Sequence, residues 1–368
     1  MMNKTEKHIR SLQPVKSIAG KTISNLQLNN EALSQLHFTD CHFSYLTLDR
    51  MQAQQLHFHR CTFSAISLNR SLLNTCTFHE CEIDTIMLKE SGLLNVSFQQ
   101  TNLRLLMTEN CQAERCLVSA CTISDSVWKN VNLSYWSAND CEITGWFMQE
   151  GQLQDSNWFG CTIAQFHCTA AAITRLVAGN STLTDGHFTG NTCDIMVWQE
   201  CRLNRTDLRE INLSSAGFAK SRLEQCRLDG SNLNYAQFNQ GTLHDCSLTG
   251  AQLTCAQFTD TGLHQCDLSN AILTSANFVR ASLNNCMLDD TGLTRTDMRF
   301  CQLKNTPLHT ALVQKTRLHG AETGLINPGQ NTDEPLLTAI DLWYARHQPG
   351  IKDTAGFSRS TPGASRYV

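Results

Sequence analysis

Residues 211–303 read INLSS AGFAK SRLEQ CRLDG SNLNY AQFNQ GTLHD CSLTG AQLTC AQFTD TGLHQ CDLSN AILTS ANFVR ASLNN CMLDD TGLTR TDMRF CQL. Every fifth residue of this stretch, from Leu213 to Leu303, is Leu, Phe or Met; we call this position i. Position i−2 carries a small residue almost throughout, and the other three positions are polar. A period of five matches neither a helix nor a single strand, so the repeat must be interpreted first.

Phenylalanine indicates how many five-residue units make one turn of the chain. It recurs at position i in steps of twenty residues: Phe38, Phe58, Phe78 and Phe98, then Phe218, Phe238, Phe258 and Phe278. Each unit reads as a short extended segment followed by a corner, so four units close one coil. The sequence therefore predicts an all-β, four-sided β-helix, a solenoid in which each coil contacts only its neighbours.

The repeat runs from Ile23 to Leu318 without an insertion, which gives (318 − 23)/5 + 1 = 60 units and hence about 15 coils. Between residues 33 and 321 no position i or i−2 carries Asp, Glu, Lys or Arg, as a narrow dry core requires. In the middle, residues 104–200, tryptophans replace small residues at i−2, and we expect distorted coils there.

The pattern divides the chain into four parts. We expect an N-terminal cap or arm over residues 1–20, the β-helix over 21–323, a linker with a C-terminal helix over 324–348, and a disordered tail over 349–368. The apolar face of that helix must be covered, either by the last coil or by a second copy; it consists of Leu336, Leu337, Ile340, Trp343 and Tyr344.

Units such as AQFNQ, CDLSN, ANFVR and SNLNY resemble the pentapeptide-repeat family over about four fifths of the chain. The resemblance implies a right-handed quadrilateral β-helix. It is a distant likeness to the quinolone-resistance members, which protect DNA gyrase as DNA mimics and dimerise through a C-terminal helix. This chain departs from them in its longer repeat tract, its lack of loop insertions and its acids, which form no unbroken column.

Composition narrows the classes of protein further. A net charge of −4 over 368 residues gives no general basic footprint, so we expect no direct binding of nucleic acid. No apolar run approaches 18 residues, and the N-terminus lacks the apolar core of a secretory signal. Of 18 cysteines, 17 fall at i or i−2, as buried free thiols would, which suits a reducing bacterial cytoplasm; Cys255 falls at i+2.

The sequence shows no arrangement typical of catalysis. A solenoid without gaps offers no obvious cleft, and we find no Gly-rich phosphate loop and no zinc-ligand spacing. We therefore expect no enzyme, no cofactor and no metal. Two histidine pairs, His37 with His57 and His59 with His79, lie one coil apart and could hold a metal ion; the simpler interpretation is that these positions are solvated.

The candidate partner surface is a row of apolar residues at the outward position i−1, twenty residues apart: Met87, Met107, Val127 and Phe147. Leu105 lies around the adjacent corner, and Glu90 and Glu150 border the row. The alternative is that irregular middle coils turn these side chains into the core.

Three functions follow as hypotheses. The first is a cytoplasmic, non-enzymatic scaffold that presents a rigid surface to another protein. The second is a DNA mimic that binds gyrase or topoisomerase and gives antibiotic protection, because residues 80–200 hold 14 acids against 5 bases, a net of −9. The third is an effector or accessory protein of type VI secretion. The partner is an unidentified protein in each case, with a homodimer through the C-terminal helix as a further expectation.

Overall fold

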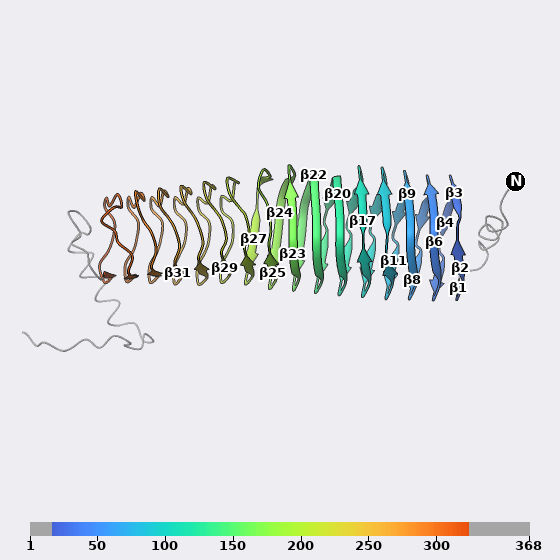
Figure 1. Cartoon of the computed structure of the whole chain (residues 1–368), viewed down its shortest axis with the longest axis horizontal. Coiled ribbons are helices and arrows are strands. Elements are labelled where there is room, and N and C mark those ends of the chain that lie inside the picture. Colours follow the sequence, from blue (N-terminus) through green and yellow to red (C-terminus); the bar gives the residue numbers. More distant parts are fainter. Residues whose placement is uncertain (1–16, 324–368) are drawn as a thin grey trace, which may run out of the picture. The chain divides into compact units, whose positions relative to one another are not determined.

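The computed structural model describes residues 17–323, and the structural statements below concern this part of the chain. Its 34 strands form one parallel ladder (Figure 1). Each strand pairs with a segment twenty residues away, from Ser17 opposite His37 to Gln302 opposite Glu322. The chain is therefore a β-solenoid of about 14 turns with four five-residue sides per coil, as the period of five predicts.

The strands are short, and most coincide with a single repeat unit. They are β1 (Ser17–Ala19), β2 (Thr22–Ser24), β3 (Gln27–Asn29), β4 (Ala32–Ser34), β5 (His37–Thr39), β6 (His42–Asp49), β7 (Gln52–Gln54), β8 (His57–His59), β9 (Thr62–Asn69), β10 (Leu72–Asn74), β11 (Thr77–His79), β12 (Glu82–Ile83), β13 (Ile86–Lys89), β14 (Gly92–Leu94), β15 (Ser97–Gln99), β16 (Asn102–Arg104), β17 (Leu106–Glu109), β18 (Gln112–Glu114), β19 (Leu117–Ser119), β20 (Thr122–Ser134), β21 (Ser137–Asn139), β22 (Glu142–Phe159), β23 (Thr162–Thr169), β24 (Ala172–Gly179), β25 (Thr182–Thr184), β26 (Thr192–Cys193), β27 (Met196–Gln199), β28 (Arg202–Asn204), β29 (Arg222–Glu224), β30 (Thr242–His244), β31 (Gly262–His264), β32 (Ser282–Asn284), β33 (Gln302–Lys304) and β34 (Glu322–Thr323).

The corners of the coil lie at position i+2. Almost every residue there has a positive φ, for example 57° at Asn25, 53° at Ala65, 49° at Arg205 and 58° at Cys255. This left-handed conformation is unusual for residues other than glycine and is least accessible to β-branched side chains. Thr85, Ile195 and Thr310 occupy corners within residues 17–323 and do not adopt it.

The core consists of the side chains at i and i−2. Phe38, Phe58 and Phe78 stack with ring centroids 5.0 and 4.9 Å apart, which confirms the predicted column. The same column continues in the later coils, where Phe238 and Phe258 lie 4.7 Å apart. Offset stacking of this kind adds to the free energy of burying the rings.

Small polar residues at i−2 bond to the backbone. The thiol of Cys61 donates to the carbonyl of His59 at 3.4 Å and to that of Phe38, in the preceding coil, at 3.5 Å. The hydroxyl of Ser221 donates in the same way to Trp198 at 2.7 Å. Cys, Ser and Thr therefore suit this position because their single donor meets a carbonyl that the coil presents there.

The middle coils keep the twenty-residue register despite their tryptophans. Trp128 stacks on Trp146 at 4.5 Å, and Trp136 meets Trp128 edge to face at 78°. The buried indole N–H of each of these three has no hydrogen-bond partner within the described residues. Ala178 lies in register between two further tryptophans, so small residues at i compensate for large neighbours.

The solenoid has two regions that differ in their corners. In residues 17–204, which we call the strand-rich coils, most sides are strands, and several strands continue through corners (Figure 1). In residues 205–322, the turn-rich coils, one side of each coil is a strand and the other three meet their neighbours through isolated bridges. Their corners close with turn hydrogen bonds, such as Ala216 N to Leu213 O at 3.0 Å.

Two predicted boundaries lie close to the limits of the described residues. Ser17–Ala19, at the first of these limits, pairs with His37–Thr39, and Ile18 occupies position i and is buried. The predicted C-terminal helix and tail lie outside the described residues. The described part of the chain contains no helix long and apolar enough to span a membrane.

Candidate functional site

The four residues of the predicted partner surface form one continuous row, which we call the stripe. Met87 pairs with Met107, Met107 with Val127, and Val127 with Phe147, on β13, β17, β20 and β22. Their exposed fractions are 46%, 43%, 40% and 43%, in the same order. The alternative that these side chains turn into the core is therefore wrong, and the stripe faces outward.

Alternation along each strand explains this exposure. Met107 lies between Leu106 and Thr108, both buried, and Phe147 lies between Trp146 and Met148, also buried. Successive side chains of a strand point to opposite faces, so filling the core on both sides forces the i−1 residue outward. The large core residues of these coils hold the stripe in place.

Charged groups and one apolar corner border the stripe. Glu90 and Glu150 are exposed, and Lys89 pairs with Glu109 at 3.4 Å between adjacent coils. Leu105, predicted to lie around the corner, is half-buried at a positive φ of 54°. The structure therefore places the five predicted residues on one side of the rod and its corner.

The row continues beyond the residues that the sequence singled out. The ring of Phe147 stacks on His167 at 5.0 Å, and His167 stacks on His187 at 4.6 Å. The row then reaches Asp207, whose carboxylate lies 4.0 Å from Nδ1 of His187. The repeat of twenty residues contained this signal, since 147, 167, 187 and 207 share one column.

Asp207 is a buried acid at an outward position, with 7% of its surface exposed. Arg209 binds its two carboxylate oxygens at 2.8 and 2.6 Å. Burial raises the pKa of Asp207, but the hydrogen bonds from Arg209 outweigh this and hold the pKa below its usual range. Burial and the neighbouring His187 lower the pKa of His167, which favours its neutral form.

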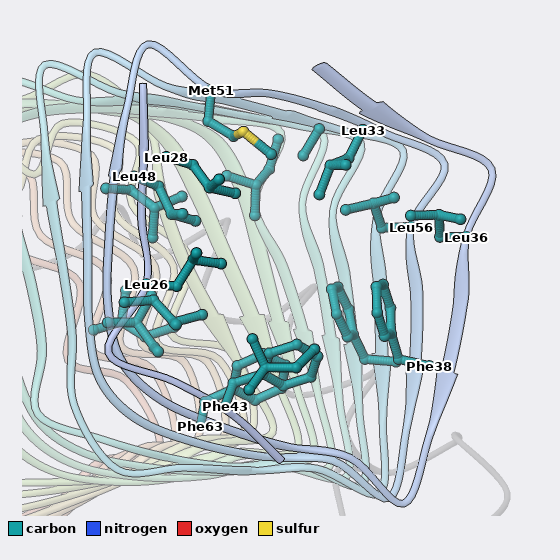
Figure 2. A pocket seen from close by; sticks show the side chains of 18 of the residues that line it. Leu26, Leu28, Leu33, Leu36, Phe38, Phe43, Leu48, Met51, Leu56 and Phe63 are labelled. Carbon is teal, nitrogen blue, oxygen red and sulfur yellow. The ribbon is translucent and has the colours of Figure 1, made fainter. Parts of the chain in front are cut away.

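A cavity of about 110 Å³ lies inside the first coils (Figure 2). Figure 2 shows Leu26, Leu36, Phe38 and Phe63 among the side chains that point into it. Its lining offers no polar surface. A space of this size without polar partners holds no ordered water, so it leaves the core of these coils less well packed.

Comparison with known families identifies the repeat. A family model described as a pentapeptide repeat region matches residues 196–271. A second, described as pentapeptide repeats (8 copies), matches residues 261–299 and 271–309. Residues 196–309 therefore match the pentapeptide-repeat models, and the repeats of this part of the chain are of that kind. The matches fall mainly on the turn-rich coils, where small residues at i−2 are most regular.

Several solved structures resemble this chain. One from the Arabidopsis thaliana thylakoid lumen is 24% identical over 28% of this chain and 68% of its own, with a TM-score of 0.25. HetL of Nostoc sp., which is involved in regulating heterocyst differentiation, is 17% identical over 90% of this chain and 100% of its own, at 0.15. QnrB1, a plasmid-mediated fluoroquinolone resistance protein, is 13% identical over 60% and 90%, at 0.31.

With TM-scores this low, none of these likenesses bears on what the protein binds. No curated protein sequence matches the chain. The fold is therefore established by the repeat and by the structure, and the function must be argued from the surface of this chain.

The structure also shows the burial of the cysteines and the stacking of the two predicted histidine pairs. Cys255 is partly exposed, and the other 17 cysteines are buried. His37 stacks on His57 at 4.6 Å, and His59 on His79 at 5.1 Å. The residues predicted for the dimer or cap helix, Leu336 to Tyr344, lie outside the described part of the chain.

Proposed function

We propose that this protein is a non-enzymatic scaffold that binds an amphipathic helix of a partner protein along the stripe. The observation that carries the proposal is the row of four apolar side chains, in register and exposed on successive coils. Most residues at i−1 elsewhere are polar. A contiguous apolar row on a surface that is otherwise polar is typical of a protein-binding site.

The spacing of the stripe favours a helix as its partner. Coils stack about 4.8 Å apart, so the four side chains span about 15 Å along the rod. An α-helix presents its apolar face once per turn of about 5.4 Å, and three turns cover nearly the same length. A helix laid along the rod axis therefore brings one apolar residue against each coil.

The charge around the stripe indicates which residues the partner helix carries beside its apolar face. Residues 80–200 carry a net charge of −9, and Glu90 and Glu150 stand beside the stripe. Several bases of this region are already paired with acids of the same region, including Arg104 with Asp84 and Lys89 with Glu109. The complementary partner has Lys or Arg on both sides of its apolar face.

The test is a double substitution, Met107→Glu with Phe147→Glu. The matched control is Met287→Glu, on the same side of the rod and equally exposed but beyond the stripe. A partner is first isolated from cell extract with the wild-type protein, and its bound segment is mapped by cross-linking.

We expect the double variant to lose binding by tenfold or more, roughly 1.4 kcal/mol, with a nearly unchanged melting temperature. The Met287→Glu variant should bind as the wild type does. Equal binding by all three proteins, or a bound segment without a basic amphipathic helix, would contradict the proposal.

The acidic surface supports a second function, mimicry of DNA toward a gyrase or topoisomerase. Its binding would depend on charge rather than on the stripe. Raising the salt concentration to about 0.5 M should abolish such binding, because exposed charges are then strongly screened. Binding through the stripe should persist at that salt concentration.

A further inference from the structure

His59 and His79 lie on adjacent coils, and their Nδ1 atoms point toward each other. They end β8 and β11 and pair in register. Their ring planes differ by 15° and their centroids lie 5.1 Å apart, yet their Nδ1 atoms are only 3.0 Å apart. The two rings therefore lean together at the atoms that could share a ligand.

A carboxylate completes the group. Glu80 follows His79 at a corner with a φ of 53°, and its Oε1 lies 4.0 Å from Nδ1 of His79. One ligand atom from each of the three residues lies within 4.8 Å of the others. Within residues 17–323 no other three His, Cys, Asp or Glu side chains meet this condition.

We propose that His59, His79 and Glu80 bind a divalent transition metal ion of the Zn²⁺ or Ni²⁺ class. Zn–N bonds are about 2.0–2.1 Å long, so two tetrahedral nitrogen ligands lie about 3.3 Å apart, close to the 3.0 Å seen here. Glu80 is exposed, so its side chain is free of packing that would keep it from the ion. Water completes the coordination on the open side.

The other histidine pairs lack one part of this arrangement. In the pair His37 and His57, Nδ1 of His57 bonds to the hydroxyl of Thr77 at 2.8 Å. In the pair His167 and His187, the nearby carboxylate of Asp207 is held by Arg209. Stacking of imidazoles alone therefore does not distinguish the proposed site; the facing Nδ1 atoms and Glu80 do.

Arg60 contacts one of the proposed metal ligands, so its substitution tests the proposal. Its Nη1 lies 3.0 Å from Nε2 of His59, while its other nitrogens bind Asp40. A guanidinium only donates, so Nε2 of His59 is the acceptor and the proton of neutral His59 lies on Nδ1. Metal binding at Nδ1 moves that proton to Nε2, and Arg60 must then release His59.

The site would join consecutive coils beside the cavity. Phe58 and Phe78, the inward neighbours of the two histidines, line that cavity. A bound ion stabilises the folded state according to its concentration relative to Kd, so the melting of these coils becomes dependent on metal.

The experiment titrates metal-free protein with ZnCl₂, and separately with NiCl₂, by calorimetry and thermal melting. Cys255→Ser serves as the background because it removes the partly exposed thiol. The variants are His79→Gln, Glu80→Gln and Arg60→Gln, with His57→Gln as the matched control from the neighbouring pair.

We expect His79→Gln to weaken binding by about tenfold or more and to remove the metal-dependent rise in melting temperature. His57→Gln should retain both, and Glu80→Gln should weaken binding. Arg60→Gln should strengthen it, because it removes a positive charge and the donor to Nε2. Equal affinity of the His79→Gln variant and the background, or no binding by the background, would overturn the proposal.

Discussion

The strand-rich and turn-rich coils are built on one repeat but differ at a single position. At i−2 the strand-rich coils mix small residues with large ones such as Leu36, Leu56 and Ile66, whereas nearly all i−2 residues of the turn-rich coils are small, as Ala216 and Ala236 are. The later coils close most of their corners with turn hydrogen bonds and bury their core almost fully as far as Leu308, and the first coils enclose a cavity. The size of the i−2 residue therefore accompanies the shape of the coil.

A physical reason connects the two observations. A small side chain lets the corner draw inward, so that the amide of residue i+3 reaches the carbonyl of residue i, as in a type II turn with a positive φ at its third residue. A leucine at i−2 keeps the backbone further out and leaves extended sides. The wider coil must then be filled by larger side chains, and the cavity marks where the filling is incomplete.

Introducing a charged residue into the core should give the largest difference in stability between the strand-rich and the turn-rich coils. Phe58 and Phe238 share one column, but Phe58 lines the cavity and Phe238 is completely buried. Phe238→Asp should cost several kcal/mol and lower the melting temperature strongly, because it puts an unpaired carboxylate among stacked coils. Phe58→Asp should fray the first coils and leave the tryptophan fluorescence of the middle coils intact, since neighbouring coils alone are coupled.

Thermal melting followed by tryptophan fluorescence separates these outcomes. A Phe238→Asp variant that melts within about a degree or two of the wild type would contradict the core position of Phe238.

Enlarging the residue at i−2 should change stability by a smaller amount, and this tests the role of that position directly. Cys76 and Ala236 share another column, with Leu56 and Val96 beside Cys76 and Ala216 and Ala256 beside Ala236. Ala236→Leu should destabilise the protein by about 1–3 kcal/mol, because it overfills a narrow coil and opens the turn. Cys76→Leu should cost less than about 1.5 kcal/mol, because its column already accommodates large residues.

Urea unfolding of both variants measures the difference. Equal losses of stability would show that the two regions do not differ in the space available at i−2.

Much of the architecture could be predicted from the sequence. The period of five and the twenty-residue spacing of Phe38, Phe58 and Phe78 predicted the core, its columns and the four-sided coil. The outward direction of the stripe also followed from its place in the repeat, although the structure was needed to exclude an inward turn.

Other features depended on contacts between side chains. Asp207 stands at an outward position, and no pattern indicated that Arg209 would hold it in a buried site. The facing Nδ1 atoms of His59 and His79 depend on ring rotation, which a repeat does not specify. Likewise, the i−2 residues carried a signal for the two kinds of coil, but the corner hydrogen bonds appear only in the structure.

The smallest expected effect is a difference in the rates at which the thiols of the unsubstituted protein react. Cys255 lies at a corner and is partly exposed, so a maleimide should label it first in the native protein. Burial raises the pKa of Cys116 to about 11 and that of Cys301 to about 12, which leaves little reactive thiolate. The buried thiols then react only when their coil opens.

The two regions should differ in this opening. We expect Cys61, beside the loosely packed first coils, to be labelled before Cys266 in the turn-rich coils, because a cavity lowers the free energy needed to open a coil. Mass spectrometry of peptides from timed labelling measures both rates. Labelling of Cys266 first, or of many cysteines as fast as Cys255, would contradict the difference in packing and would instead place the weaker coils at the turn-rich end.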